Sequence, residues 1–373
     1  MSWKWFEMQR NTIQTSHRPS RHCAFAVFFL SLLALLNSPI RADDVWKKID
    51  GVWEGGSTAV IWKMVVWPGK DLVIASTRSN GLWSSSDGGE NWKRMGQPGK
   101  TPSNAGQAVT FVFDPTDPKT MWTAGMYNYG VWKTSDAGQT FTHLGKNDHC
   151  DGIAVDFADP LRKTLLLGLH EQEHSLHRST DGGLTWERIG DKIPEGTAFT
   201  TDPIIIDSKT YVINSSGYKK GEAWGIYRTE DAGQTWAQVS KEGAGGNYTF
   251  TSKGQIFWSC LWDQHMITST DQGKTWSRVR GPARGRIIEV VPDTLIALGG
   301  SNKTRFFFSK DNAQTWTPFG PVVPFKGHDV AYDPIRKCLY VWKDIDTSPV
   351  IRPPGTIARW DLPPNIESAF AIH

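Results

Sequence analysis

One eight-residue pattern recurs six times along the chain and constrains its fold more than any other feature. Each copy begins with Ser or Thr, has Asp at its third position and ends on Trp or Phe. Five of the six copies carry Gly at the fifth position, and the sixth carries Ala313 there. The octets occupy residues 85–92, 134–141, 179–186, 229–236, 269–276 and 309–316. Their aspartates are 49, 45, 50, 40 and 40 residues apart, so the chain is an internal repeat.

The residues of the octet predict a tight turn between two strands. The Asp carboxylate and the Ser or Thr hydroxyl can hydrogen-bond to the turn backbone, and Gly permits a positive φ. The aromatic residue at the end of the octet is expected to pack between neighbouring sheets. Because Ala313 replaces the turn glycine in the last copy, we expect that hairpin to be strained or differently wound.

Short strand patterns surround each octet, as at residues 108–114, 120–124, 130–133 and 141–144. A repeat of 40 to 50 residues that holds four such strands has the length of one propeller blade. After the sixth octet, three further strand patterns follow, at 329–333, 338–342 and 357–360, without a fourth. Val45–Ile49 matches the strand that follows each octet. The sequence therefore predicts an all-β, seven-bladed β-propeller, closed by pairing of the N-terminal strand in the last blade.

The first 42 residues have the layout of a secretory signal peptide. A basic leader precedes an apolar run at Ala24–Leu36, and small residues follow before Ala42. We expect cleavage near Ala42, a secreted or periplasmic protein without a membrane anchor, and a single propeller over residues 43–373. The remainder holds 36 basic and 37 acidic residues, without a basic tract that would neutralise phosphates. This balance excludes nucleic acid as a partner, and we expect a monomer.

Three cysteines remain after the leader, Cys150, Cys260 and Cys338, and their spacing is not that of a metal site. We expect buried thiols. His149 and Asp151 could act as metal ligands together with His170 and His174, but this spacing matches no recognised metal motif. The sequence therefore predicts no cofactor.

The octets resemble the Asp-box, or BNR repeat, of secreted sialidases, xyloglucan-degrading hydrolases, sortilin-type receptors and the photosystem II assembly factor. The resemblance covers about Val45 to Leu362. It implies that the octets are structural turns on the face opposite the active site. The opposite face, which the connections between blades and between the second and third strands of each blade form, would then carry any site. A true sialidase is not expected, because no Arg-Ile/Leu-Pro motif occurs near Trp46 to Trp67 and that family has six blades.

Five of the eight histidines of the mature chain fall on this predicted site face: His149, His170, His174, His265 and His328. Histidine at the mouth of a propeller can act as a base, an acid or a metal ligand, although long loops also simply collect polar residues. Glycoside hydrolysis needs two carboxylates about 5 Å or roughly 6.5 to 9.5 Å apart. The catalytic candidates are Asp151, Glu171, Asp202, Asp263, Asp329 and His149. Asp151 is favoured as one member because its neighbours can shift its pKa, but its partner stays open.

Aromatic and cationic residues on the same face are candidates for substrate binding. Exposed aromatic rings stack on sugar faces, whereas buried ones would only pack between blades; arginines can clamp an anionic group or be surface charges. The substrate-binding candidates are Arg78, Tyr127, Tyr129, His170, Trp224, Trp262, Arg286, Arg305 and His328.

From the resemblance, the leading functional hypothesis is a secreted glycoside hydrolase of the sialidase-like superfamily that acts on a glycan or polysaccharide. The alternative is a non-catalytic binding or assembly propeller that holds a protein or peptide. A third hypothesis is a propeller polysaccharide lyase. Two carboxylates 5 to 10 Å apart in a deep pocket would favour hydrolysis, and a flat arginine or aromatic patch would favour binding.

Overall fold

The computed structural model describes residues 45–49, 51–56, 60–102, 105–195, 199–216, 223–245, 248–260, 265–281, 283–300, 303–343 and 357–363. Contacts divide the chain into two compact units, Met1–Arg41 and Ala42–His373, and all described residues belong to the second. The expected signal peptide therefore lies outside the described residues. Apart from two 3-10 turns, Glu54–Gly56 and Gly190–Lys192, the described elements are strands. A search of the described residues for a helix of membrane-spanning length and apolarity finds none.

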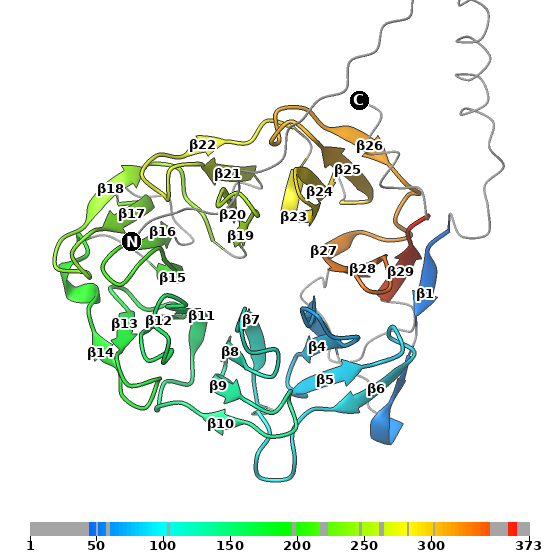
Figure 1. The fold of residues 1–373 in the computed structure, drawn as a ribbon, viewed down its shortest axis with the longest axis horizontal. Coiled ribbons are helices and arrows are strands. Elements are labelled where there is room, and N and C mark those ends of the chain that lie inside the picture. Colours follow the sequence, from blue (N-terminus) through cyan, green and yellow to red (C-terminus); the bar gives the residue numbers. More distant parts are fainter. Residues whose placement is uncertain are drawn as a thin grey trace, which may run out of the picture. The chain divides into compact units, whose positions relative to one another are not determined.

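The strands form seven sheets that follow one another around a ring (Figure 1). In each blade, the strand named first below is the innermost one. Blade 1 contains β3 (Ile61–Val66), β4 (Val73–Thr77), β5 (Leu82–Ser85) and β6 (Asn91–Arg94). Blade 2 contains β7 (Gln107–Phe113), β8 (Met121–Met126), β9 (Gly130–Thr134) and β10 (Thr142–His143). Blade 3 contains β11 (Cys150–Val155), β12 (Leu165–Leu169), β13 (Leu176–Ser179) and β14 (Glu187–Arg188).

The next three blades repeat this order. Blade 4 contains β15 (Phe199–Ile205), β16 (Tyr211–Ser216), β17 (Gly225–Thr229) and β18 (Ala237–Ser240). Blade 5 contains β19 (Tyr248–Phe250), β20 (Ile256–Cys260), β21 (His265–Ser269) and β22 (Ser277–Arg278). Blade 6 contains β23 (Ala283–Val291), β24 (Thr294–Gly299), β25 (Arg305–Ser309) and β26 (Thr317–Phe319). The predicted all-β, seven-bladed propeller is confirmed.

Blade 7 combines strands from both ends of the described chain. It contains β27 (Gly327–Asp333), β28 (Cys338–Lys343) and β29 (Ile357–Asp361), and β1 (Lys47–Ile49) pairs antiparallel with β29. Trp46, just before β1, stacks on Phe306 with ring centroids 5.7 Å apart, and its Nε1–H donates to the Pro321 carbonyl at 3.2 Å. The N-terminal strand is thus the outer strand of the C-terminal sheet.

Blade 1 has a fifth strand that the repeat pattern did not predict. β2 (Val52–Trp53) pairs parallel with β6. Trp53 is buried there, with its ring stacked on Trp92 at a centroid distance of 4.9 Å and an interplanar angle of 10°. The indole pair anchors the chain between β1 and blade 1 on the outer edge of the sheet.

The octets form the tight turns that were predicted between the third and fourth strands. In the first copy, the Ser85 hydroxyl and the Asn91 backbone N–H both donate to Asp87 Oδ1, at 2.8 and 2.9 Å. The Gly89 N–H donates to Ser85 Oγ at 2.8 Å. Although desolvation raises it, hydrogen bonds from Asn91 and Ser85 lower the pKa of Asp87 to about 2. The carboxylate is therefore charged and committed to the turn.

The sixth octet keeps the same turn despite its alanine. The Ala313 N–H donates to Ser309 Oγ at 2.9 Å, as the glycine does in the other copies. Ala313 has φ of 66°, a left-handed conformation that costs energy for any residue with a Cβ. The sequence predicted a hairpin that is either strained or differently wound. The structure shows the strained alternative, with the same turn as in the other copies.

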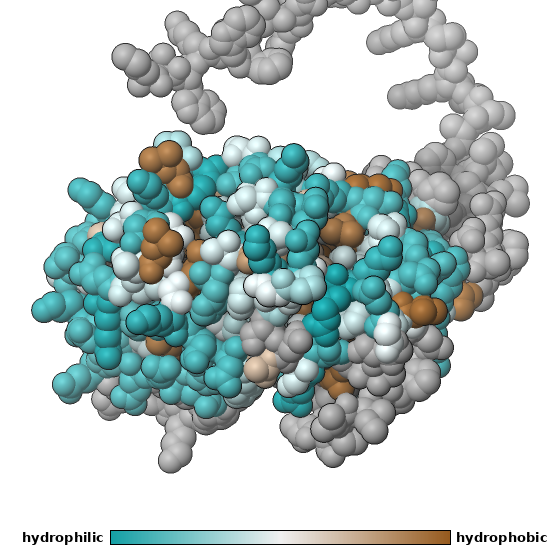
Figure 2. Space-filling model, turned by 90° about the horizontal axis from the view of Figure 1, so that it is seen from below, coloured by the Kyte–Doolittle hydropathy of each residue, from teal (hydrophilic) through white to brown (hydrophobic). Residues whose placement is uncertain are grey.

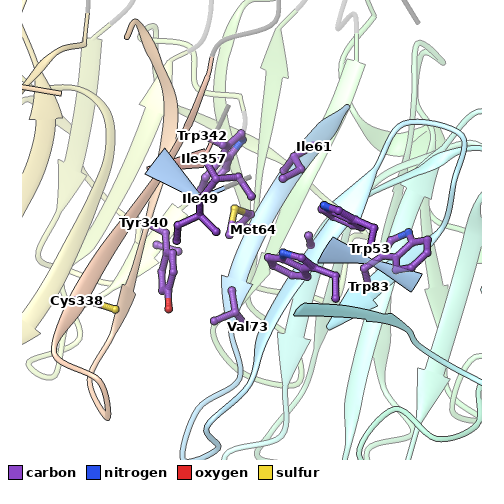
Figure 3. Packing of buried hydrophobic residues seen from close by; sticks show 13 residues of the cluster. Ile49, Trp53, Ile61, Met64, Val73, Trp83, Cys338, Tyr340, Trp342 and Ile357 are labelled. Carbon is purple, nitrogen blue, oxygen red and sulfur yellow. The ribbon is translucent and has the colours of Figure 1, made fainter. Parts of the chain in front are cut away.

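The core is a series of hydrophobic clusters between neighbouring blades. In the cluster between blades 7 and 1, side chains of β28 and β29 point toward Met64 of β3 (Figure 3). Cys150 and Cys338 are buried free thiols, as predicted, and the Cys260 side chain lies outside the described part. The outer surface in Figure 2 is mostly hydrophilic, with separate apolar patches. The core thus lies between neighbouring sheets. The innermost strand of each blade lines a central channel.

Candidate functional site

The first strands of the blades carry β-bulges close to the predicted site face. Register shifts occur between Ile61 and Lys63 of β3, between Cys150 and Gly152 of β11, and between Gly327 and Asp329 of β27. Blades 2, 4 and 6 have comparable shifts in their first strands. A bulge inserts a residue that leaves the regular ladder and re-aims its side chain. In blade 3 that residue is Asp151.

Asp151 belongs to a group that we call the histidine cluster: Tyr127, His149, Asp151, His170 and Glu171. Its members come from the β8–β9 turn of blade 2, the segment before β11, the bulge of β11, and the β12–β13 turn of blade 3. The His170 backbone N–H donates to the His149 carbonyl at 2.8 Å, which joins the two loops of blade 3. The structure therefore brings together five of the residues predicted for the site.

His170 lies between two carboxylates. Its Nδ1 is 2.7 Å from Asp151 Oδ1, and its Nε2 is 3.7 Å from Glu171 Oε1. An ionised carboxylate only accepts hydrogen bonds, so Nδ1 carries the proton and the neutral ring has its lone pair on Nε2. Nε2 is buried and has no hydrogen-bond partner among the described residues. Desolvation lowers the pKa of His170, but the hydrogen bond and charge of Asp151, with the charge of Glu171, raise it above its usual value.

In neutral His149 the proton lies on the other ring nitrogen, Nε2. The Tyr127 backbone N–H donates to His149 Nδ1 at 2.9 Å, so this nitrogen carries no proton and the neutral ring holds it on Nε2. Desolvation and the nearby His170 lower the pKa of His149 against the opposing charges of Asp151 and Glu171. The two rings meet edge to face, with centroids 4.7 Å apart. One histidine thus favours the charged form and its neighbour the neutral form, a separation typical of acid–base sites.

A metal ion does not fit this donor set well. One ligand atom each from His149, His170 and Glu171 lies within 4.8 Å of the others. His170 is suited to coordination, because a metal-ligating histidine usually donates its other nitrogen to a carboxylate. For His149, coordination through Nε2 would require the proton to move to Nδ1, where it would face the Tyr127 N–H. The arrangement is better suited to proton transfer than to holding a metal.

Unusual backbone conformations gather in the two loops of the histidine cluster. Tyr127 and Asn128 have φ of 57° and 67°, and Glu171 and His174 have φ of 52° and 53°. Residues other than glycine adopt this region at a cost, which surrounding contacts must offset. The exposed Tyr127 ring lies beside the two imidazoles, at centroid distances of 5.2 Å from His149 and 5.6 Å from His170.

A second group of polar residues surrounds the adjacent end of the central channel, in a cavity of about 600 Å³. We call it the polar ring: Lys63, Thr110, Asp202, Tyr248, Arg286 and Asp329. The first five line the cavity, and Asp329 is buried close enough to act on the charge of Lys63. The polar ring contains two predicted catalytic candidates, Asp202 and Asp329, and one predicted binding residue, Arg286.

Two hydrogen bonds connect the polar ring to the histidine cluster through β7. Lys63 Nζ donates to the Val109 carbonyl at 2.8 Å, and the Thr110 hydroxyl donates to the Asp151 carbonyl at 2.9 Å. Asp202 also reaches the cluster, because a methyl group at Gly152 would meet its Oδ1 at 2.8 Å. The two groups therefore form one continuous polar surface.

Lys63 was not predicted, although it lies at the centre of the polar ring. It is only 8% exposed. Desolvation and the neighbouring Arg286 lower its pKa to about 8, against the opposing charges of Asp329 and Asp202. The available signal in the sequence was a lysine inside the apolar run of 61–66.

The remaining predicted binding residues lie in separate places. Arg78 lies over the Trp62 ring at 5.8 Å, and the His328 ring is 5.8 Å from the same indole. Arg305 is exposed at the first residue of β25, whereas Arg286 lines the channel. The arginines suggested as an anionic clamp thus occupy different settings, and Arg286 instead lies near Lys63, on whose pKa it acts.

Two predicted substrate-stacking aromatics are buried, which corrects that expectation. Tyr129 is 1% exposed and packs with Trp67 and Phe141 in the cluster between blades 1 and 2. Trp224 is 6% exposed, and its indole occupies the space that a side chain at Gly243 would need. Both rings therefore pack inside the fold. The sequence left this open as the alternative to sugar stacking. Trp262 and Asp263 lie outside the described residues.

Comparisons with known proteins agree with this architecture. A family model described as "DUF6242 beta propeller domain" matches residues 184–324. A protein of Neosartorya fischeri described as "Probable oligoxyloglucan-reducing end-specific xyloglucanase" is 29% identical over 202 residues, which are 49% of this chain and 22% of that protein. The chain thus matches less than a third of the length of that relative.

Two solved structures share the fold. The GH74 enzyme of Niastella koreensis superposes with a TM-score of 0.58 at 15% identity, over 79% of this chain and 53% of that one. The structure titled "YCF48 bound to D1 peptide" superposes with a TM-score of 0.53 at 18% identity, over 86% of this chain and 97% of that one. Together, these matches support a β-propeller of the BNR-type superfamily. The xyloglucanase homologues suggest a glycoside-hydrolase-like propeller, and the other neighbours keep a non-catalytic propeller open.

Proposed function

We propose that this BNR-type propeller hydrolyses a glycosidic bond at the histidine cluster. The observation that carries the proposal is the Asp151–His170–Glu171 array, in which a carboxylate lies at each nitrogen of one imidazole. Such an array can hold a proton at a defined atom and release it at a pH near neutrality. It lies beside a cavity of about 600 Å³, and sugar-binding sites are concave in the same way.

In the proposed reaction, Glu171 is the general acid. Its side chain is 41% exposed, so its carboxyl group can reach a bound glycan. A proton passes from Glu171 to the glycosidic oxygen as the bond between that oxygen and the anomeric carbon breaks. His170 is a positioning residue that returns a proton to Glu171 from Nε2, and Asp151 stabilises the imidazolium form during this step.

The second carboxylate of the proposed pair is Asp202. Hydrolysis requires a group that takes a proton from water as the water oxygen bonds to the anomeric carbon. Asp202 lines the cavity and packs against Gly152, next to Asp151. A glycan that lies across blades 3 and 4 would then have Glu171 on one side and Asp202 on the other. Tyr127, 48% exposed, offers its ring as a stacking surface for a neighbouring sugar.

The relatives support the class of substrate and no more than that. The Neosartorya fischeri relative is named as a xyloglucanase, and the GH74 structure is named as an enzyme. For this chain, a polysaccharide substrate, export from the cell and a monomeric state are part of the proposal. The mature N-terminus is proposed to lie near Asp43, which N-terminal sequencing of the exported protein would test.

The experiment is a reducing-end assay of the full chain with xyloglucan and other plant, algal and animal polysaccharides. On a polymer that is cleaved, Glu171→Gln is expected to lower turnover about a hundredfold or more, as loss of a general acid does. The matched control is Glu187→Gln, because Glu187 is an exposed glutamate of β14 that pairs with Arg178 at 3.1 Å. Equal turnover of the two variants would refute the role of Glu171.

A non-catalytic, peptide-binding propeller is the second candidate. The peptide-bound neighbour is matched over 97% of its length, and the channel of this chain is lined mainly by apolar side chains such as Ile204, Ile288 and Ala331. This candidate predicts that no polysaccharide in the panel is cleaved and that a peptide binds at the channel mouth.

A further inference from the structure

The polar ring carries its positive charge on one side. Blade 7 lies between blades 6 and 1, so Asp329 of β27 is flanked by Arg286 of β23 and Lys63 of β3. Asp202 is on blade 4, across the channel. Around Asp329 the fold therefore places two cations, and Asp202 is a second carboxylate whose charge acts on Lys63 from blade 4.

Burial makes these two cations costly to keep charged. Lys63 is 8% exposed, and this burial, together with the charge of Arg286, lowers its pKa. The Nε of Arg286 is buried and has no hydrogen-bond partner in the part of the chain that the structure describes. A buried cationic donor without a partner is expensive, and an anion that accepts its hydrogen bond offsets that cost.

The carboxylate of Asp329 does not accept a hydrogen bond from Arg286 Nε, which has no partner among the described residues. Its Oδ1 accepts the Val330 backbone N–H at 2.8 Å, so part of its capacity is committed to the strand. Lys63 in turn donates to the Val109 carbonyl, on the side of the ring away from blade 7. Lys63 and Arg286 thus both line the cavity, and the charges of Asp329 and Asp202 act on Lys63 there.

We propose that the channel mouth binds a carboxylate group of the glycan between Lys63 and Arg286, so that the substrate is an acidic polysaccharide rich in uronic acid. This proposal rests on the proposed glycan hydrolysis and adds its substrate class. The link through β7 supports it, because Val109 contacts Lys63 and the next residue, Thr110, contacts Asp151. A glycan whose carboxylate enters the channel would therefore lie next to the histidine cluster.

The proposal makes binding depend on pH in a defined direction. The groups that face Lys63 are Arg286, Asp329 and Asp202, with Tyr248 on the same cavity wall. Burial and Asp202 raise the pKa of Tyr248, so it stays neutral where Lys63, with a pKa of about 8, loses its proton. A bound carboxylate prefers the ammonium form, so affinity falls as the pH rises above about 8. In Lys63→Arg the cation persists and this fall disappears.

The test is titration calorimetry of the full chain with a uronic acid oligosaccharide, its methyl ester and a neutral xyloglucan oligosaccharide. The acid is expected to bind about tenfold or more tightly than its ester, because the ester cannot form the charged hydrogen bonds. Lys63→Met is expected to remove this difference. Lys70→Met is the matched control, since Lys70 lies in the β3–β4 turn of the same blade, near the Trp67 ring.

Acid and ester binding equally to the unaltered chain would overturn the proposal, even if Lys63→Met did not fold. Tighter binding of a peptide with a free C-terminal carboxylate than of any uronic acid oligosaccharide would also overturn it. Repeating the titration with Glu171→Gln separates the two proposals. If Glu171→Gln still binds the acid more tightly than its ester but shows no turnover, the carboxylate site is supported. Hydrolysis is then tested separately by the reducing-end assay.

Discussion

Replacing Trp46 with alanine would test whether the N-terminal strand stabilises the last blade. Trp46 is 7% exposed and stacks on Phe306, and its indole N–H donates to the Pro321 carbonyl. Its ring centroid is also 5.8 Å from that of Trp360. Truncation of a buried tryptophan costs about 3 to 5 kcal/mol, since burial and packing are both lost. We expect about 3 kcal/mol, the lower end of this range, because Trp46 directly precedes β1, the outer strand of its sheet.

The assay is guanidinium unfolding followed by far-ultraviolet circular dichroism, with Val45→Ala as the control. Val45 is 53% exposed beside Trp46, so its truncation is expected to change stability by less than about 0.5 kcal/mol. A loss below about 1 kcal/mol in Trp46→Ala would refute the packing argument. It would mean that β1 contributes little to the stability of the C-terminal sheet.

Three further predictions concern the site and the octets. Asp151→Asn is expected to lower the pKa of His170, because the carboxylate raises it; proton NMR titration of the ring measures this, and an unchanged or higher pKa would contradict the array. Because the pKa of His170 is higher in the folded than in the unfolded protein, its protonation stabilises the fold. This contribution is complete below the unfolded-state pKa of about 6.5 and is lost as the pH rises through the folded-state pKa. Asp151→Asn should remove this contribution. Gly152→Ala would bring a methyl group to 2.5 Å from the Asp202 Cα, so thermal unfolding should show a loss of about 1 to 3 kcal/mol, and wild-type stability would contradict this close approach. Asp87→Ala should cost about 1 kcal/mol by the same assay and leave turnover unchanged; a stable but inactive variant would overturn the structural role of the octets.

The fold was predictable because its signals are local and repeated. The octets fix the turns through hydrogen bonds within four residues, as between Asp87 and Asn91, so the pattern alone identifies them. Val45–Ile49 could be assigned to the last blade by its likeness to the other outer strands. β2 could not be predicted, since its two residues pair parallel with a strand of a different segment.

The site was predictable in its location and less so in its contacts. The gathering of His149, Asp151 and His170 on one face follows from the order of strands and loops. Their pairing depends on the bulge at Asp151, which a register shift of one residue creates and which alternation alone does not reveal. Tyr129 and Trp224 were expected to be exposed because loop aromatics look alike in sequence, whether they face solvent or a neighbouring blade.

The most direct test of the proposed hydrolysis is mass spectrometry of products formed by the full chain in heavy-oxygen water. Hydrolysis at the histidine cluster predicts shorter oligosaccharides with one heavy oxygen at each new reducing end. It also predicts that these products are lost with Glu171→Gln and retained with Glu187→Gln. Unsaturated products without the label, or intact polymers throughout the panel, would contradict the account.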